Sequence, residues 1–197
     1  MSTSGRLPAT VRKPDDRRVS RTRRSIDEAF LALLERRGYE AVAVSDIVRA
    51  ADVGRATFYE HYASKDDLLR AQLRHVSTLL RTVGAPSGFL DATPLFAHVR
   101  DVPLLYRLIA GRSAAARSLR ILQEVLQERV ATVLDEHIAA GASLRAPLTA
   151  AVAARVIVAQ LAALLAWWTD TGMAATADEM QQLFQACAAP LVATWHA

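Results

Sequence analysis

The segment Ser45–Leu69, SDIVRAADVGRATFYEHYASKDDLL, has the clearest structural pattern in this chain of 197 residues. It predicts two short helices, Ser45–Ala51 and Arg55–Tyr62, joined by a tight turn at 52–54 and followed by the start of a third helix. Two helices joined in this way are typical of a helix-turn-helix, whose second helix enters the major groove of DNA. The segment therefore indicates a protein that binds a DNA site.

The composition favours an all-α fold, and the charge is concentrated at the N-terminus. Ala and Arg are abundant and are strong helix formers, and 52% of the residues are hydrophobic, which is enough for a sizeable core. Residues 1–24 hold 8 basic and 2 acidic side chains, whereas residues 25–74 hold 7 basic and 9 acidic ones. The basic arm is thus suited to contact phosphates, and a solvated tail that serves solubility is the alternative.

Other classes of function find little support in the sequence. Cys187 is the single cysteine, so a disulfide framework and a Cys-based metal site are excluded. The N-terminus lacks the apolar core of a signal peptide, and together these two features favour the cytoplasm. A nucleophile elbow, a Gly-rich phosphate loop and a telling His–carboxylate pair are all missing from the sequence, so we expect neither an enzyme nor a cofactor or metal.

Gly and Pro residues interrupt the helical patterns, and we divide the chain into three expected parts. We expect a flexible basic arm at 1–20, a helix-turn-helix domain at 21–80 with its motif at about 43–62, and a helical regulatory and dimerisation domain at 81–197. The first helix is expected to begin near Arg21 and to end at Gly38, and Ser64 is expected to cap the helix after the motif. Strand-like alternation is absent from the sequence. The later helices are expected at Pro94–Arg100, Pro103–Ala110, Ala114–Ala140, Pro147–Thr171 and Thr176–Trp195, the last one kinked or ended early by Pro190.

The expected helix Pro147–Thr171 is apolar almost all round. Its length is compatible with a membrane span, but Arg155 near its middle carries an insertion cost of roughly 2.5–3.5 kcal/mol that the many alanines offset little. We therefore expect no membrane and a helix that is buried on several sides, one against its own domain and one against a second subunit.

Residues 21–75 resemble the TetR family of bacterial transcriptional regulators. The resemblance rests on the Gly38-Tyr39 helix ending, the helix 47–51, the Val53-Gly54 turn, the run Thr57-Phe58-Tyr59-x-His61-Tyr62, and Ser64-Lys65-Asp66-x-Leu68. More than a dozen positions at fixed spacing are far more specific than a bare helix-turn-helix. Beyond residue 81 the resemblance is limited to several helices and nearly the right length.

The motif supplies candidate DNA contacts, each with an ordinary structural alternative. Arg55 can reach guanine O6 and N7, or it is a solvated surface arginine. The hydroxyls of Thr57 and Tyr59 can donate to phosphates, and Tyr59 can instead pack on its neighbours. His61 can donate to a phosphate or serve as a surface or capping residue. The full set of candidates is Ser45, Arg55, Ala56, Thr57, Tyr59, His61 and Lys65, with Arg12 and Lys13 from the arm; Phe58 and Tyr62 are assigned to the core.

Ala56 and Lys65 are two further candidates for DNA contact. Ala56 is small enough for close approach to a thymine methyl, or it is ordinary helix filler. By the resemblance, Lys65 binds a phosphate at the N-terminus of the helix after the motif.

The chain departs from the family pattern at three positions. Family members usually carry Thr at the position of Val44, so Ser45 is expected to take over the helix cap there. Asp52 replaces a glycine and is a residue that tolerates the left-handed conformation. Glu60 puts a negative charge on the second motif helix, where it either reads a cytosine amino group or points away from the groove.

The resemblance also implies partners. It implies a homodimer that binds a palindromic operator through two half-sites, with an interface formed by the last two helices. It further implies a repressor released by a small hydrophobic or aromatic effector; the alternative is a regulator without an effector, whose C-terminal domain serves only dimerisation or protein contacts. The interface set on the last helix is Met180, Leu183, Phe184, Cys187 and Leu191. The candidate pocket residues are Phe89, Phe96, His98, Tyr106, Trp167, Trp168 and Met173.

Overall fold

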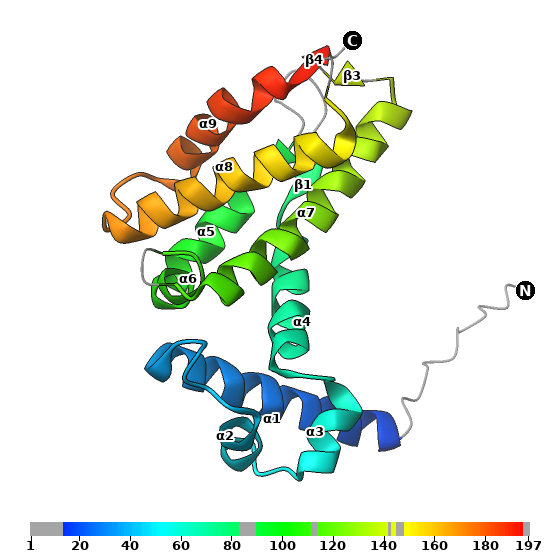
Figure 1. The fold of residues 1–197 in the computed structure, drawn as a ribbon, viewed down its shortest axis with the longest axis vertical. Coiled ribbons are helices and arrows are strands. Elements are labelled where there is room, and N and C mark those ends of the chain that lie inside the picture. Colours follow the sequence, from blue (N-terminus) through cyan, green and yellow to red (C-terminus); the bar gives the residue numbers. More distant parts are fainter. Residues whose placement is uncertain (1–13, 83–89, 112–113, 142, 145–147, 195–197) are drawn as a thin grey trace, which may run out of the picture.

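The computed structural model describes residues 14–82, 90–111, 114–141, 143–144 and 148–194, and these residues form an all-α protein (Figure 1). Two groups of helices are visible, and α4 connects them. The first group contains α1 (Pro14–Arg37), α2 (Val44–Ala50), α3 (Arg55–His61) and α4 (Lys65–Ser77). The second group contains α5 (Thr93–Asp101), α6 (Pro103–Ile109), α7 (Ala116–Ala139), α8 (Ala150–Asp170) and α9 (Ala177–Ala188).

The first helix is longer than the sequence pattern predicts. It begins at Pro14 instead of near Arg21, so part of the expected flexible arm at 1–20 is helical. Proline at the first helical position has a suitable φ and lacks only a donor that would have no partner there. The helix ends as predicted, because Gly38 adopts a φ of 72°. Arg12 and Lys13, the candidate arm contacts, lie outside the described residues.

Two short antiparallel ladders were not predicted. One pairs β1 (Arg81–Thr82) with β2 (Leu90–Asp91), and the other pairs β3 (Ser143–Leu144) with β4 (Val192–Thr194). Segments of two or three residues are too short to produce a visible alternation in the sequence.

Several helix ends in the second group differ from the expectation. Thr149 caps α8, whose described start is Ala150 and not Pro147, and α7 begins at Ala116. The capping box of Thr176 and Glu179 at the start of α9 is confirmed. The α9 helix ends at Ala188 and continues as the 3-10 turn Ala189–Leu191, so Pro190 ends the helix early, one of the two outcomes that its sequence predicts.

The helices of the second group pack around α8. This helix contacts α6, α7 and α9, while α5 packs on α9, and α4 and α1 reach across to α7 and α6. Within the described residues α8 is the one helix long and apolar enough to cross a membrane. Its inward side chains, including Ile157, Leu161 and Trp168, are nevertheless fully buried within this chain. A single connected hydrophobic core runs through both groups of helices, so α4 is held on both sides.

Candidate nucleic-acid interface

The α3 helix has one buried side and one exposed side. Phe58 is 0% exposed and Tyr62, directly after the helix, is 3% exposed, which confirms that both belong to the core. Arg55 and Ala56 are exposed, and the Tyr59 side chain is 53% exposed although it is aromatic. A tyrosine left this far in solvent beside an arginine gives the helix a polar surface that can meet a ligand. The remaining motif candidates, Thr57 and His61, are half-buried, whereas Glu60 is exposed.

A chain of polar contacts fixes the end of α3 against α1. The Tyr62 hydroxyl donates to Asp27 Oδ1 at 2.6 Å, and Arg23 Nε donates to the Tyr62 hydroxyl at 3.0 Å. The Arg23 guanidinium also lies over the Tyr62 ring. Burial, followed by the hydrogen bond to Asp27, raises the pKa of Tyr62 to about 12, so the phenol stays neutral at physiological pH. The sequence alone assigned Tyr62 only to the core and missed these two partners on another helix.

The turn between α2 and α3 has the backbone conformation that its sequence predicts. Asp52 adopts a φ of 53°, in the left-handed region that the family's usual glycine would enter freely. The next amide, Val53 N, donates to the Val48 carbonyl at 3.0 Å and closes the end of α2. Asp52 therefore replaces glycine at some cost in strain but without loss of the turn.

The prediction that Ser45 caps α2 is wrong. Ser45 lies inside the first turn, and the N-cap residue is Ala43, whose amide donates to Asp46 Oδ2 at 3.1 Å. The Asp46 carboxylate thus provides the cap from within the helix, which leaves the exposed Ser45 hydroxyl available to a phosphate. Val44 is half-buried against the core, consistent with its apolar side chain.

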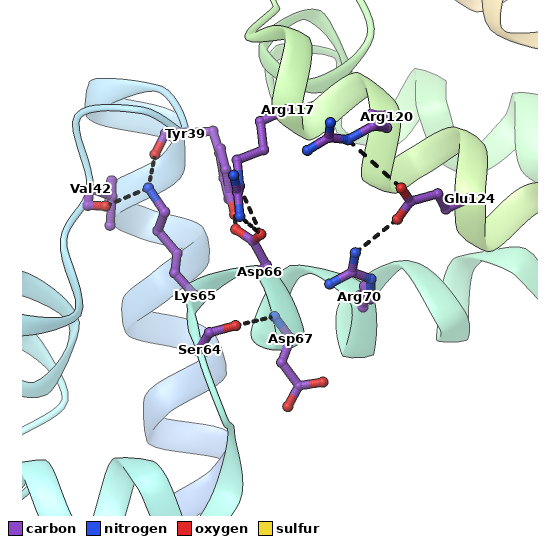
Figure 2. A network of polar contacts seen from close by, with 10 residues as sticks. All are labelled: Tyr39, Val42, Ser64, Lys65, Asp66, Asp67, Arg70, Arg117, Arg120 and Glu124. Carbon is purple, nitrogen blue, oxygen red and sulfur yellow. Dashed lines mark hydrogen bonds and ion pairs between the residues drawn. The ribbon is translucent and has the colours of Figure 1, made fainter.

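Lys65 at the start of α4 points toward the loop that links α1 to α2 (Figure 2). Its Nζ donates to the carbonyl oxygens of Tyr39 and Val42, at 2.8 Å each, and lies 4.2 Å from the centroid of the Tyr39 ring. Burial lowers the pKa of the Lys65 ammonium. Because two of its three donors are engaged, Lys65 fastens the loop that links α1 to α2 and has one donor left for a phosphate.

We expect Lys65→Met to lower the free energy of unfolding by about 1–2 kcal/mol, because two carbonyl oxygens lose a charged donor at a partly exposed site. Denaturant unfolding measures this. Arg24→Met, at an exposed position of α1, is the control and should leave the unfolding midpoint within error. If Lys65→Met leaves the unfolding midpoint unchanged but weakens DNA binding, Lys65 acts only as a phosphate contact.

Asp66 joins three parts of the molecule (Figure 2). It accepts hydrogen bonds from the Tyr39 hydroxyl and from Arg117, whose Nε lies 2.7 Å from Asp66 Oδ2. The Arg117 guanidinium holds the pKa of the Asp66 carboxyl below its usual value, and burial together with the bond to Asp66 raises that of Tyr39. Tyr39 follows α1, whereas Asp66 and Arg117 lie in the first turns of α4 and α7, so the site couples the motif to the second group of helices.

A second ion pair along the same two helices supports this junction. Arg70 of α4 donates to Glu124 of α7 at 2.8 Å, and Arg120 lies 3.7 Å from the other oxygen of the same carboxylate. These side chains are partly exposed, so their contribution to stability is small, but their geometry fixes which side of α7 faces α4.

Exposed arginines of α1 extend the basic surface near α3. Arg18, Arg21 and Arg24 are exposed, and the N-terminal end of α1 lies beside α3 (Figure 1). Arg18 belongs to the stretch 1–20 that was expected to be a flexible arm, but it lies on α1. A rigid helix presents the same charges at fixed positions, which lowers the entropic cost of binding a phosphate backbone.

The candidate pocket residues do not lie together in one site. Phe96 and Trp168 are fully buried, pack edge to face at 5.8 Å and form core, while Trp168 Nε1 donates to the Ala175 carbonyl. Trp167 is 51% exposed and lines a surface groove next to Gly111. Phe89 lies outside the described residues, and Met173 is half-buried with a φ of 55°. His98 and Tyr106 line one common cavity, which lies between α1, α4, α5 and α6.

The comparisons with known proteins agree with this site. Residues 26–71 match the model of bacterial regulatory proteins of the tetR family. The chain is 46% identical to the uncharacterized HTH-type transcriptional regulator YxbF of Bacillus subtilis over 63 residues, which are 32% of this chain. Over 77 residues, 36% of this chain, it is 46% identical to the HTH-type transcriptional repressor LfrR of Mycolicibacterium smegmatis. These matches span only 17% and 39% of the two relatives.

Solved structures extend the similarity in fold to most of the chain. The TetR regulator tylp of Streptomyces fradiae superposes with a TM-score of 0.67 at 22% identity, covering 91% of this chain and 83% of that one. A TetR transcriptional regulator of Streptococcus agalactiae gives a TM-score of 0.58 at 21% identity, covering 88% and 97%. The second group of helices therefore has the fold found in these regulators.

Proposed function

We propose that this chain is a member of the TetR family of bacterial regulatory proteins, whose model residues 26–71 match, and that it acts as a homodimeric repressor of transcription. The dimer binds a palindromic operator, and a small molecule releases it. The observation that carries the proposal is the exposed polar side of α3, with Arg55 and the 53% exposed Tyr59, above a fully buried Phe58 anchor. The repressor assignment is supported by the similarity to LfrR.

In the proposed complex α3 enters the major groove, and the basic surface of α1 follows the phosphates. Arg55 at the first position of α3 reads a base edge, because the N-terminal residues of a recognition helix lie deepest in the groove. Tyr59, Thr57 and Ser45 donate to phosphates and set the register. The family's non-enzymatic role agrees with the expectation that the chain is not an enzyme.

We expect Arg55→Ala to weaken operator binding by about 1–3 kcal/mol and to relax the preference at one base pair per half-site. Binding titrations against single-base operator variants measure both effects. Arg12→Ala in the arm is the control, since it should weaken all sequences alike and lower the salt slope. If Arg55→Ala weakens binding to all operator variants equally, Arg55 contacts a phosphate and does not read a base.

The dimer is proposed to form through the outer faces of α8 and α9. Val152 and Trp167 on α8 are 49% and 51% exposed, Leu183 on α9 is 43% exposed, and Cys187 is exposed on the same side of α9 as Leu183. The exposed Ala159 and Ala163 between the α8 residues allow close helix approach. The predicted set on α9 requires one correction, because Met180 and Phe184 are 0% exposed and pack inside their own chain.

The experiment that tests the proposed function is selection of bound sites from random DNA by the full chain. The expected result is an inverted repeat with one helical turn or a multiple of it between half-site centres. Recovery of no enriched sequence at about 0.15 M salt would contradict specific DNA binding. A thermal-shift screen that stays flat across ligand classes would favour the alternative, a regulator whose C-terminal helices serve only dimerisation or protein contacts.

A further inference from the structure

The cavity between the two groups of helices has the features of a binding site. Its volume is about 240 Å³, and its wall comes from α1, α4, α5 and α6. Most of the wall is aliphatic, for example Leu34, Leu73 and Ile109. Its polar members are Gln72, His75, His98 and Tyr106, and the described lining includes no Asp, Glu, Lys or Arg.

Tyr106 is the unusual member of this wall. The residue is 1% exposed, and its hydroxyl has no hydrogen-bond partner among the described residues. A buried hydroxyl without a partner costs free energy, and such groups are rare in folded proteins. Burial raises the pKa of Tyr106, so the hydroxyl remains a neutral donor at physiological pH. His98 packs edge-on to the Tyr106 ring at 5.8 Å and holds the ring in place.

We propose that this cavity binds a small, uncharged, mainly apolar molecule whose carbonyl or hydroxyl oxygen accepts a hydrogen bond from Tyr106. Size limits the ligand, since an engineered cavity of about 150 Å³ holds one benzene, so about 240 Å³ suits roughly ten non-hydrogen atoms. The absence of charged side chains from the described lining disfavours an ionised ligand.

The position of the cavity gives the ligand a route to the DNA-binding helices. Leu31 and Leu34 belong to α1 and Leu69 to α4, whereas Leu105 and Tyr106 belong to α6. A bound molecule therefore contacts both groups of helices at once, next to the helix that directly follows the motif. Binding itself depends only on the cavity, and its effect on DNA rests on the proposed function.

The test uses the full chain and two probes of matched shape, acetophenone and α-methylstyrene, of which only the first has an acceptor oxygen. Calorimetry and thermal shift without DNA should show that acetophenone binds about fivefold more tightly, the ratio that one neutral hydrogen bond supplies. Tyr106→Phe should remove this ratio while leaving binding of α-methylstyrene unchanged. Val76→Phe should block both probes by filling the cavity, and Thr132→Val, a hydroxyl deletion at an exposed site on α7, should change neither.

Three results would overturn the site: no binding of either probe, equal binding of both to the natural chain, or an unchanged ratio in Tyr106→Phe. Tyr106→Phe retains the ring and its packing, so it keeps the test decisive if Val76→Phe fails to fold. A separate titration measures operator affinity with and without acetophenone. Probe binding that leaves operator affinity unchanged would contradict effector release and not the site, and a chain that binds the probe but no DNA would contradict the proposed function alone.

Discussion

Leu183→Glu is expected to convert the proposed dimer into a monomer and to weaken operator binding by about 10²–10⁴-fold. The proposed interface would hold two copies of this residue, and each carboxylate would have to be buried without a partner. A single subunit then binds one half-site and loses the effective concentration that the second recognition helix provides. Light scattering measures the mass, and titration of the selected operator measures the affinity.

Leu104→Glu is the matched control for this substitution. Leu104 lies on α6 and is 48% exposed, close to the 43% of Leu183, but it is not on the α8 and α9 faces. The control variant should remain a dimer with unchanged operator affinity. A Leu183→Glu protein that still runs as a dimer would place the interface elsewhere, and retained full affinity in a proven monomer would contradict two-site recognition.

Asp66→Ala is expected to lower the free energy of unfolding by about 2–3 kcal/mol, and hence the melting temperature by about 4–12 °C. The substitution leaves the hydroxyl of Tyr39, a residue only 1% exposed, without its acceptor, and this dominates the effect. Arg117→Met should have a smaller effect, because its side chain is 53% exposed and stays solvated when the pair is lost. Calorimetry compares the variants, and an equal effect of both would contradict the dominant role of Tyr39.

The Asp66 carboxylate also predicts a pH dependence. Arg117 and Tyr39 hold the pKa of Asp66 below its ordinary value of 3.8, so folding stabilises the charged form. This contribution is complete at pH values above 3.8 and is lost as the pH falls through the lowered folded value. Stability of the natural chain should therefore fall more steeply below about pH 4 than that of Asp66→Asn. Asp135→Asn, an exposed carboxylate on α7, should retain the steep fall of the natural chain.

The sequence predicts helix ends and turns correctly where residues close together in the chain form them. The Gly38 stop, the left-handed Asp52 turn and the Thr176 capping box all depend on backbone geometry within a few residues, so the sequence contains the necessary information. The Phe58 and Tyr62 core positions followed from a spacing of four residues. Boundaries were less accurate, as the Pro14 start of α1 shows, because helix ends compete closely with alternative conformations.

The sequence by itself determined the all-α class, the motif and the polar residues of α3, because helical periodicity and turn chemistry act over short distances. Only the tertiary structure decided that Lys65 donates to two carbonyls and that Asp66 meets Arg117. It also decided that Tyr106 lines a shared cavity and that its hydroxyl has no hydrogen-bond partner among the described residues. Each of these depends on residues brought together from distant parts of the chain, and a single sequence contains no signal for such pairings. Burial, hydrogen bonding and charge therefore assign roles to these residues that their spacing in the chain could not.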